Sequence, residues 1–422
     1  MWRSIFGSFG VRVLSALLNL ALVILFSQLT GAAGKGEQSL LLTSVAIITI
    51  FDSFIGGAAL VYLSSRYAWV QLLKAAYVWI LLVSFSAYIL LFYLKILSAA
   101  YLLDVIVLSA ISALSSVHTA LILGQQRIKA YNAVQIAVPL LTLLTCLLQW
   151  YVGASLNYAL ALYIAYTVAL LLSCIFVAIY YPKSTPNHTQ TGVQVFKQMA
   201  KFGFFNQLAH VLQLLSFRAS YYLLEEYNGN AAVGIFSNAS SITESIWLIA
   251  TSISLWQYAA ISNSDNHTYT LQITEKLTRF GLIAALFGVV FFLVLPADFY
   301  AFVFGKEFSA LQFLMLLLAP GVWAFTYALV VGHYFSGHGK YWVNALASGI
   351  GLLFSLAFSF LLIPNFSTAG AAIAASLSYI ATSAVVLFFF RKEGGAFTLF
   401  PYKAEWQQFF TQIRVLWRRS SL

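Results

Sequence analysis

The sequence predicts an all-α polytopic membrane protein with about twelve transmembrane helices. Hydrophobic residues make up 61% of the 422 residues and charged residues only 8%. Soluble domains carry roughly a quarter charged residues, so little of this chain is expected outside the membrane. In a membrane protein, a net charge of +10 indicates first that Lys and Arg anchor the loops on the cytoplasmic side. It does not indicate nucleic-acid binding.

Twelve apolar runs are long enough to cross a bilayer, which requires about 20 residues each. They are Ser8–Thr30, Ser39–Leu63, Leu72–Leu94, Leu102–Gly124, Tyr131–Tyr151, Tyr158–Tyr181, Phe202–Leu224, Ala232–Ser262, Leu277–Phe302, Leu311–Tyr334, Trp342–Ile363 and Gly370–Phe390. A polar stretch separates the first six from the last six. The predicted domains are a six-helix N-terminal lobe at 1–181, a cytoplasmic linker at 182–201, a six-helix C-terminal lobe at 202–391 and a cytoplasmic tail at 392–422.

The distribution of Lys and Arg predicts the orientation of the chain. Of the 22 such residues, only Lys35, Lys95 and Lys306 fall on one side of the predicted membrane. Arg12 and Arg218 lie deep within runs, and the others lie on the opposite side, at the ends of runs or between them. Because cytoplasmic loops retain positive charge, both termini are expected in the cytoplasm. The tail from Lys403 to Ser420 has apolar residues at helical spacing and is predicted to lie on the cytoplasmic membrane surface or to bind a partner.

Two hairpins carry charges inside the membrane. The first pairs Arg12 with Asp52, and the second, Phe202–Ser262, pairs Arg218 with Glu244. An ionisable side chain within a span is costly and by default marks a pathway or a site. The alternatives are that Arg12 snorkels to the interface and that Arg218 and Glu244 form a purely structural ion pair. The functional interpretation is that these charges face a hydrated central cavity.

Further polar residues accompany these charges. Asn206, His210 and Gln213 recur on one face of the seventh run, and a helix that faced lipid would not accumulate them. His118, inside the fourth run, is either a hydrogen-bonded histidine of the bundle or a proton relay.

Several chemistries have no motif in the sequence. Gly332 and Gly337 have the spacing of a phosphate-binding loop, but His338 follows where Lys is required. No zinc-protease motif, nucleophile elbow or Cys/His metal cluster is present. We therefore expect neither an enzyme nor a cofactor.

Five short motifs follow one another along the chain. They are FSQLTGAAGKGEQSLLLT near the start and then LLEEYNGNAAVGIFSNASSITE, FVFGKEFSALQFLMLLLAPG, YFSGHGKYWVNA and LLIPNFSTAGAAIAASLSY. In order and spacing these motifs resemble those of the Wzx-type polysaccharide flippases, and the resemblance extends over nearly the whole chain. This family translocates O-antigen and capsule repeat units and belongs to the MOP superfamily, together with MATE exporters and lipid II flippases. The family often has Pro near the start of the seventh helix, where this chain has Phe204, Phe205 and Asn206.

The resemblance implies two six-helix lobes around a central, often cationic cavity in a bacterial inner membrane. It implies that an undecaprenyl-diphosphate-linked oligosaccharide crosses that membrane by alternating access coupled to an ion gradient. The expected partners are this lipid-linked substrate and membrane lipids, and the resemblance also allows polysaccharide assembly proteins. The implied substrate contacts are Arg12, Arg218, Asn206, His210 and Gln213, and the implied ion-coupling or cavity residues are Asp52, Glu244 and His118.

Two other functions compete with flipping. A MATE-like exporter of cations and drugs favours buried acids without buried arginines, which argues against it here. A membrane enzyme of polysaccharide assembly requires catalytic carboxylates on a large extramembrane loop, and the sequence has no loop of that size.

Overall fold

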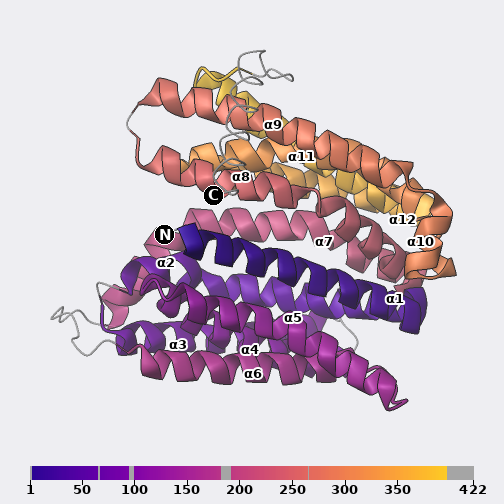
Figure 1. Cartoon of the computed structure of the whole chain (residues 1–422), viewed down its shortest axis with the longest axis horizontal. Helices are drawn as coiled ribbons and strands as arrows, with labels where there is room; N and C mark the ends of the chain where they lie inside the picture. The colour runs from indigo at the N-terminus through magenta and orange to yellow at the C-terminus, as the bar shows by residue number, and fades with distance from the viewer. Residues whose placement is uncertain (1, 65–66, 95–98, 182–191, 265, 397–422) are drawn as a thin grey trace, which may run out of the picture. The chain divides into compact units, whose positions relative to one another are not determined.

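A computed structural model describes residues 2–64, 67–94, 99–181, 192–264 and 266–396 of the chain, and in this part the regular secondary structure is helical, without a strand (Figure 1). The elements are α1 (Trp2–Asp52), η1 (Ser53–Ile55), α2 (Gly57–Leu63), α3 (Trp69–Leu94), α4 (Ala99–Gly124), α5 (Ile128–Tyr151), α6 (Tyr158–Ile179), α7 (Gly192–Glu244), α8 (Trp247–Ser262), α9 (His267–Val294), α10 (Ala297–Phe304), η2 (Lys306–Phe308), α11 (Leu311–Gly337) and α12 (Tyr341–Lys392). The predicted amphipathic tail helix lies outside the described residues.

Three of these helices consist of two arms joined at a single non-helical residue. The break falls at Gly31 in α1, at Gly229 in α7 and at Ser367 in α12. Gly31 and Gly229 adopt nearly the same backbone conformation, with φ of 66° and 76° and ψ of −169° and 175°. Only glycine adopts this region of backbone space readily, so the sequence fixes these two breaks.

The twelve predicted runs all fall on helical segments. Eight helices of the described chain are long and apolar enough to cross a membrane, and α1 and α12 among them have two arms. The first arm of α7 provides one further pass. The second arm of α7 and α8, which follows it, together provide another. The prediction of an all-α polytopic membrane protein with about twelve transmembrane helices is therefore confirmed.

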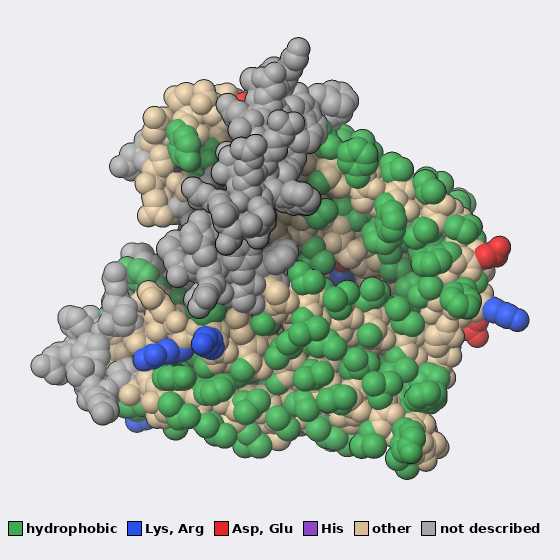
Figure 2. Space-filling view, in the orientation of Figure 1, with side chains coloured by type: hydrophobic (Ala, Val, Ile, Leu, Met, Phe, Trp, Pro, Cys, Tyr) green, Lys and Arg blue, Asp and Glu red, His purple; other side chains and the backbone are tan. Residues whose placement is uncertain are grey.

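Large apolar side chains cover the outer faces of the helices (Figure 2). Leu81 is 70% exposed, Phe287 71% and Leu353 66%. In a soluble protein such continuous apolar surface is unfavourable, whereas in a bilayer it faces hydrocarbon. This chain is therefore a multi-pass membrane protein.

The described chain forms two compact units. Unit 1 comprises the residues up to Ile235 together with Ala301–Phe308, and unit 2 comprises Phe236–Tyr300 and the residues from Ser309 onward. This division differs from the predicted lobes, because the first arm of α7 and the end of α10 belong to unit 1. The lobe boundaries at 181 and 202 therefore remain a prediction.

Each unit is built around one buried helix. In unit 1, α4 packs against α1, α2, α3, α5 and α6, and in unit 2, α11 packs against α8, α9 and α12. These two helices are the fourth and the tenth pass of the described chain, so they hold the same position in the two sets of six. This correspondence is the pattern of a repeat in which each half contributes six passes.

The breaks at Gly31 and Gly229 each form the turn of a hairpin of two helical arms, and we call these the glycine hairpins. Their two turns pack against each other within unit 1. A Cβ atom added to Gly36 would overlap the carbonyl of Asn230, and one added to Gly234 would overlap the carbonyl of Ala32. Gly36 follows the break at Gly31 by five residues, and Gly234 follows the break at Gly229 by the same interval. We call this contact the hairpin clasp. It explains why the first arm of α7 groups with the first six passes.

A third segment packs on the clasp. The Glu307 carboxylate accepts a hydrogen bond from the Ala32 N–H at 2.6 Å, and Gln28 Nε2 donates to the carbonyls of Phe302 and Val303 at 2.8 Å each. These bonds hold the end of α10 and η2 against the turn of α1. They account for the inclusion of Ala301–Phe308 in unit 1.

Candidate functional site

Asp52 lies at an interruption of the second pass. It is the last residue of α1, and η1 and the extended Gly56 follow it. Its side chain is 4% exposed, and neither carboxylate oxygen has a hydrogen-bond partner among the described residues. An unpaired polar group in a dry environment is costly. No described hydrogen bond therefore offsets the cost of burying the Asp52 carboxylate.

Side chains of other helices satisfy the backbone just before Asp52. Gln207 Nε2 of α7 donates to the Ile50 carbonyl at 2.8 Å, and Trp79 Nε1 of α3 donates to the Phe51 carbonyl at 3.1 Å. The interruption is thus held in place while the carboxylate itself is left without a donor.

The sequence predicts an acidic partner for each of the two intramembrane arginines, Arg12 and Arg218. The side chain of Arg12 lies outside the described residues, so its pairing with Asp52 stays a prediction. Arg218 lies on the first arm of α7, half-buried, with its guanidinium 5.4 Å from the centre of the Tyr221 ring. Glu244 belongs to unit 2, and its pairing with Arg218 also stays a prediction.

Lys35 was assigned from the sequence to an outer loop, but it is only 4% exposed. Its Nζ donates to Gln38 Oε1 at 2.8 Å and to Ser39 Oγ at 3.2 Å. The structure therefore buries a lysine in the same unit as Arg218. Sequence reasoning missed this burial because Lys35 lies in a turn between Gly34 and Gly36.

The predicted polar face of α7 has unequal members. Asn206 and Gln213 are half-buried, whereas His210 is exposed. Further along the same arm, the Tyr222 hydroxyl lies 2.7 Å from Ser44 Oγ on the second arm of α1. The first arm of α7 and the second arm of α1 therefore contact each other through a polar pair there. That Asn206, His210 and Gln213 face away from lipid stays a prediction.

Glu244 has a defined partner in unit 2. It is the last residue of α7, and its Oε1 accepts a hydrogen bond from the Tyr379 hydroxyl of α12 at 2.9 Å. Tyr379 packs in an aromatic cluster with Trp247 and Phe325, with ring centres 5.3 and 5.5 Å away. Trp247 Nε1 in turn donates to the Val322 carbonyl at 2.9 Å. Glu244 is thus anchored to the core of unit 2.

Both ring nitrogens of His118 have neighbours within unit 1. Nε2 contacts the Tyr77 hydroxyl, and Nδ1 lies 3.0 Å from Ser173 Oγ. The side chain is 3% exposed. This arrangement suits the hydrogen-bonded histidine of a bundle, and the proton-relay interpretation stays a prediction.

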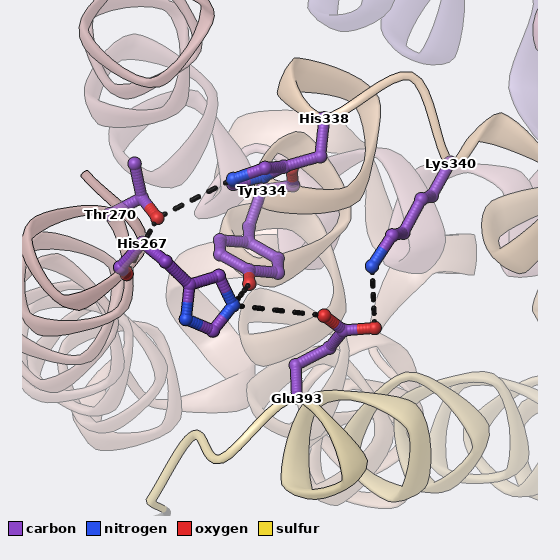
Figure 3. A network of polar contacts seen from close by, with 6 residues as sticks. All are labelled: His267, Thr270, Tyr334, His338, Lys340 and Glu393. Carbon is purple, nitrogen blue, oxygen red and sulfur yellow. Dashed lines mark hydrogen bonds and ion pairs between the residues drawn. The ribbon is translucent and has the colours of Figure 1, made fainter. Parts of the chain in front are cut away.

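A polar network in unit 2 joins the start of α9, the end of α11 and the residues that flank α12 (Figure 3). Glu393, just after α12, accepts from Lys340 Nζ at 2.6 Å, and its other oxygen lies 3.8 Å from His267 Nε2. The hydrogen bond from Lys340 lowers the pKa of the Glu393 carboxyl from its ordinary 4.5. Tyr334 and Thr270 continue the network to His267 and His338. None of these residues was singled out from the sequence as a site.

Comparison with known proteins gives a partial relative and several complete structural neighbours. No family model matches the chain. The capsular polysaccharide biosynthesis protein CapF of Staphylococcus aureus is 28% identical over 173 residues, which cover 40% of this chain. The match spans 44% of the length of CapF.

Several solved structures that match are membrane transporters or flippases. The lipid II flippase MurJ in an inward closed conformation aligns with a TM-score of 0.73 and 13% identity, over 92% of this chain and 87% of MurJ. An inward-facing multidrug resistance MATE transporter of the MOP superfamily aligns with a TM-score of 0.69 and 12% identity, over 90% and 94% of the two chains. The MATE transporter VcmN of Vibrio cholerae aligns with 0.66 and 14%, over 92% and 96%. The chain therefore has the fold that these transporters share, and none of these neighbours is an enzyme.

Proposed function

We propose that this chain is a flippase that moves an undecaprenyl-diphosphate-linked oligosaccharide across a bacterial inner membrane by alternating access, driven by an ion gradient. The fold is that of transporters, among them a flippase of lipid II. A curated protein with sequence similarity to part of the chain is a capsular polysaccharide biosynthesis protein. Both termini would lie in the cytoplasm, as the Lys and Arg distribution predicts.

The observation that carries the proposal is the pair of cations Lys35 and Arg218 within one unit of a transporter fold. A lipid-linked diphosphate is a strong anion, and an arginine fork binds phosphate oxygens with two hydrogen bonds. Arg218 would contact the diphosphate or an acidic sugar, with Arg12 in support. Asn206, His210 and Gln213 would hydrogen-bond the sugar on the same arm of α7.

The acids would serve ion coupling in this proposal. Asp52 suits that role because it is buried and has no described donor. Glu244 would organise the second unit through Tyr379, and His118 would act within the bundle of unit 1. Membrane lipids would be natural partners, and proteins of polysaccharide assembly would receive the cargo.

The test is complementation in a bacterium that lacks its own repeat-unit flippase. The native chain should restore surface polysaccharide, and Arg218→Ala should lose it, because the substrate anion loses its contact. Arg127→Ala is the matched control: Arg127 is an exposed arginine that packs on the Tyr180 ring outside the spans, and its loss should leave export intact. Equal export by Arg218→Ala and the native chain would contradict the proposed role of Arg218.

A MATE-like exporter of cations is the second candidate, because the unpartnered carboxylate of Asp52 would also suit a cationic drug. Drug resistance of the same cells distinguishes the two. Resistance that requires Asp52 and tolerates loss of Arg218, together with no change in surface polysaccharide, would favour the exporter.

A further inference from the structure

The second arm of α12 ends in two adjacent cations. Arg391 and Lys392 lie in the last turn of the helix, and both are exposed. None of the ion pairs found between described residues includes either of them. The negative end of the helix macrodipole favours cations at this position, but it does not fix where their side chains point.

The acid next to these cations is held by other groups. Glu393 accepts a hydrogen bond from Lys340 Nζ at 2.6 Å, and its other carboxylate oxygen lies 3.8 Å from His267 Nε2. Lys340 precedes α12, and His267 begins α9. Because the Glu393 carboxylate already has these partners, the last turn of α12 keeps a local positive charge.

The Lys392 side chain turns back along the helix. Its Nζ lies 4.4 Å from the centre of the Phe388 ring and 5.8 Å from that of Phe389, each about one turn earlier. A lysine at the end of a span ordinarily extends toward water, whereas this ammonium lies over aromatic rings of the span. A cation–π contact contributes little at an exposed site. The ammonium is therefore placed where an anion at the edge of the membrane would meet it.

A hollow in the surface of α12 lies beside the two cations. Its lining includes Ala384, Leu387, Phe388, Arg391 and Lys392. These residues recur at the three- and four-residue spacing of one helix face. Ala384 and Phe388 are exposed, and the small Ala384 leaves room beside its larger neighbours. The hollow is thus apolar toward the middle of the span and cationic toward its end.

An aromatic pair marks the level of this end of the helix. Trp342, near the start of α12, packs edge-on against Phe389 with ring centres 5.1 Å apart, and it is exposed. Tryptophan is enriched where the hydrocarbon core meets the lipid headgroups. Arg391 and Lys392 follow Phe389 closely in the sequence, so the cationic end of the hollow corresponds to the headgroup level.

We propose that this hollow binds an anionic phospholipid of the cytoplasmic leaflet. The lipid phosphate contacts Arg391 and Lys392, which supply charge-assisted hydrogen bonds to its oxygens. One acyl chain lies along Leu387 and Ala384. The inference does not rest on the proposed function, because it concerns a lipid of the bilayer and not the cargo.

Charge complementarity favours a lipid over the tail of the chain as the occupant. The tail from Lys403 to Ser420 carries four basic residues and a single acid, Glu405. A cationic segment would repel Arg391 and Lys392, whereas a lipid phosphate attracts both. Anionic lipids of the cytoplasmic leaflet attract basic residues near the membrane in the same way.

The test uses the full chain in a neutral detergent and native mass spectrometry, which counts bound lipids. Phosphatidylglycerol and phosphatidylcholine with the same acyl chains are titrated separately, and the Kd of the first bound lipid is measured. The native chain should bind phosphatidylglycerol about tenfold or more tightly, the difference expected for a charge-assisted contact. Undecaprenyl phosphate is the third probe, because it separates a carrier lipid from a phospholipid.

Two variants locate the lipid. Arg391→Gln combined with Lys392→Gln should weaken phosphatidylglycerol binding about tenfold or more. Ala384→Leu fills the hollow without changing any charge and should weaken it about threefold or more, an estimate of the same order. Arg127→Gln combined with Lys129→Gln is the matched control. Both of these residues are exposed on the same predicted side, and Arg127 also packs over an aromatic ring.

The inference is overturned if the native chain does not prefer phosphatidylglycerol, which is the result expected if the tail filled the hollow. It is also overturned if the control pair loses as much affinity as the Arg391 and Lys392 pair, since surface charge alone would then explain binding. Unchanged affinity in Ala384→Leu would exclude the hollow. Tighter binding of undecaprenyl phosphate that requires Arg391 and Lys392 would assign the hollow to a carrier lipid instead.

Discussion

Asp52 and Glu244 hold comparable positions in the two halves of the chain. Each is the last residue of a long helix that is divided by a non-helical glycine, and the helix is interrupted after each one. Yet Glu244 accepts a hydrogen bond from Tyr379, which is packed in an aromatic cluster. Asp52 is 4% exposed and has no described partner.

The difference separates an anchoring role from a functional one. A buried acid that accepts a hydrogen bond contributes to stability, whereas one without a donor reduces it. Proteins keep the second kind where a ligand or an ion supplies the missing partner during the working cycle. The comparison therefore predicts that transport depends more on Asp52 and that stability depends more on Glu244.

The largest effect should come from Asp52→Asn. This nearly isosteric change removes the charge, and transport should fall about 100-fold or more, equivalent to roughly 2.8 kcal/mol. The unfolding midpoint should stay the same or rise, because no described contact is lost. Both are measured on one preparation, by surface polysaccharide and by thermal unfolding. Asp298→Asn, at an exposed acid of α10, is the control, and a strongly destabilised Asp52→Asn protein would break the comparison.

The next effect should come from Glu244→Leu. The Tyr379 hydroxyl would lose its acceptor in a buried cluster, which costs about 1–3 kcal/mol of unfolding free energy. Glu244→Gln keeps an acceptor and should retain most of the stability and transport. Chemical denaturation in detergent measures the first quantity. A Glu244→Gln variant that is stable but inactive would assign Glu244 the role proposed for Asp52.

A smaller effect is expected for Tyr379→Phe. Removing the donor alone should cost about 0.5–1.5 kcal/mol. A double-mutant cycle with Glu244→Leu should give a coupling energy of at least about 0.5 kcal/mol, since the two residues touch. Fully additive effects would show that the hydrogen bond between them contributes nothing measurable.

The smallest expected effect is on stability and comes from the ion pair of Glu393 with Lys340. Glu393 lies outside the predicted spans, and it is a reference for the two acids within them, Asp52 and Glu244. Lys340 lowers its pKa from 4.5, so the stabilising contribution is fully present above pH 4.5 and is lost as the pH falls through the lowered value. The native chain should therefore be more stable than Lys340→Met near neutral pH, and the difference should vanish in acid. A difference that grows as the pH falls would contradict this assignment.

The sequence alone determined the membrane class, the twelve passes and the two glycine hairpins. Run length and the conformational freedom of glycine are local properties, so no tertiary information was needed for them. It also singled out Asp52, Arg218 and Glu244, because an ionisable group within an apolar run is conspicuous by itself. It did not predict the burial of Lys35, because a lysine flanked by glycines in a turn has the local pattern of an exposed loop.

Only the tertiary structure decided how these residues are partnered. Tyr379 lies 135 residues from Glu244 along the chain, and nothing local in the sequence marks it as the donor. The clasp likewise depends on two turns about 200 residues apart meeting at glycines. Burial and pairing arise from packing between distant segments, whereas composition and periodicity report on one segment at a time.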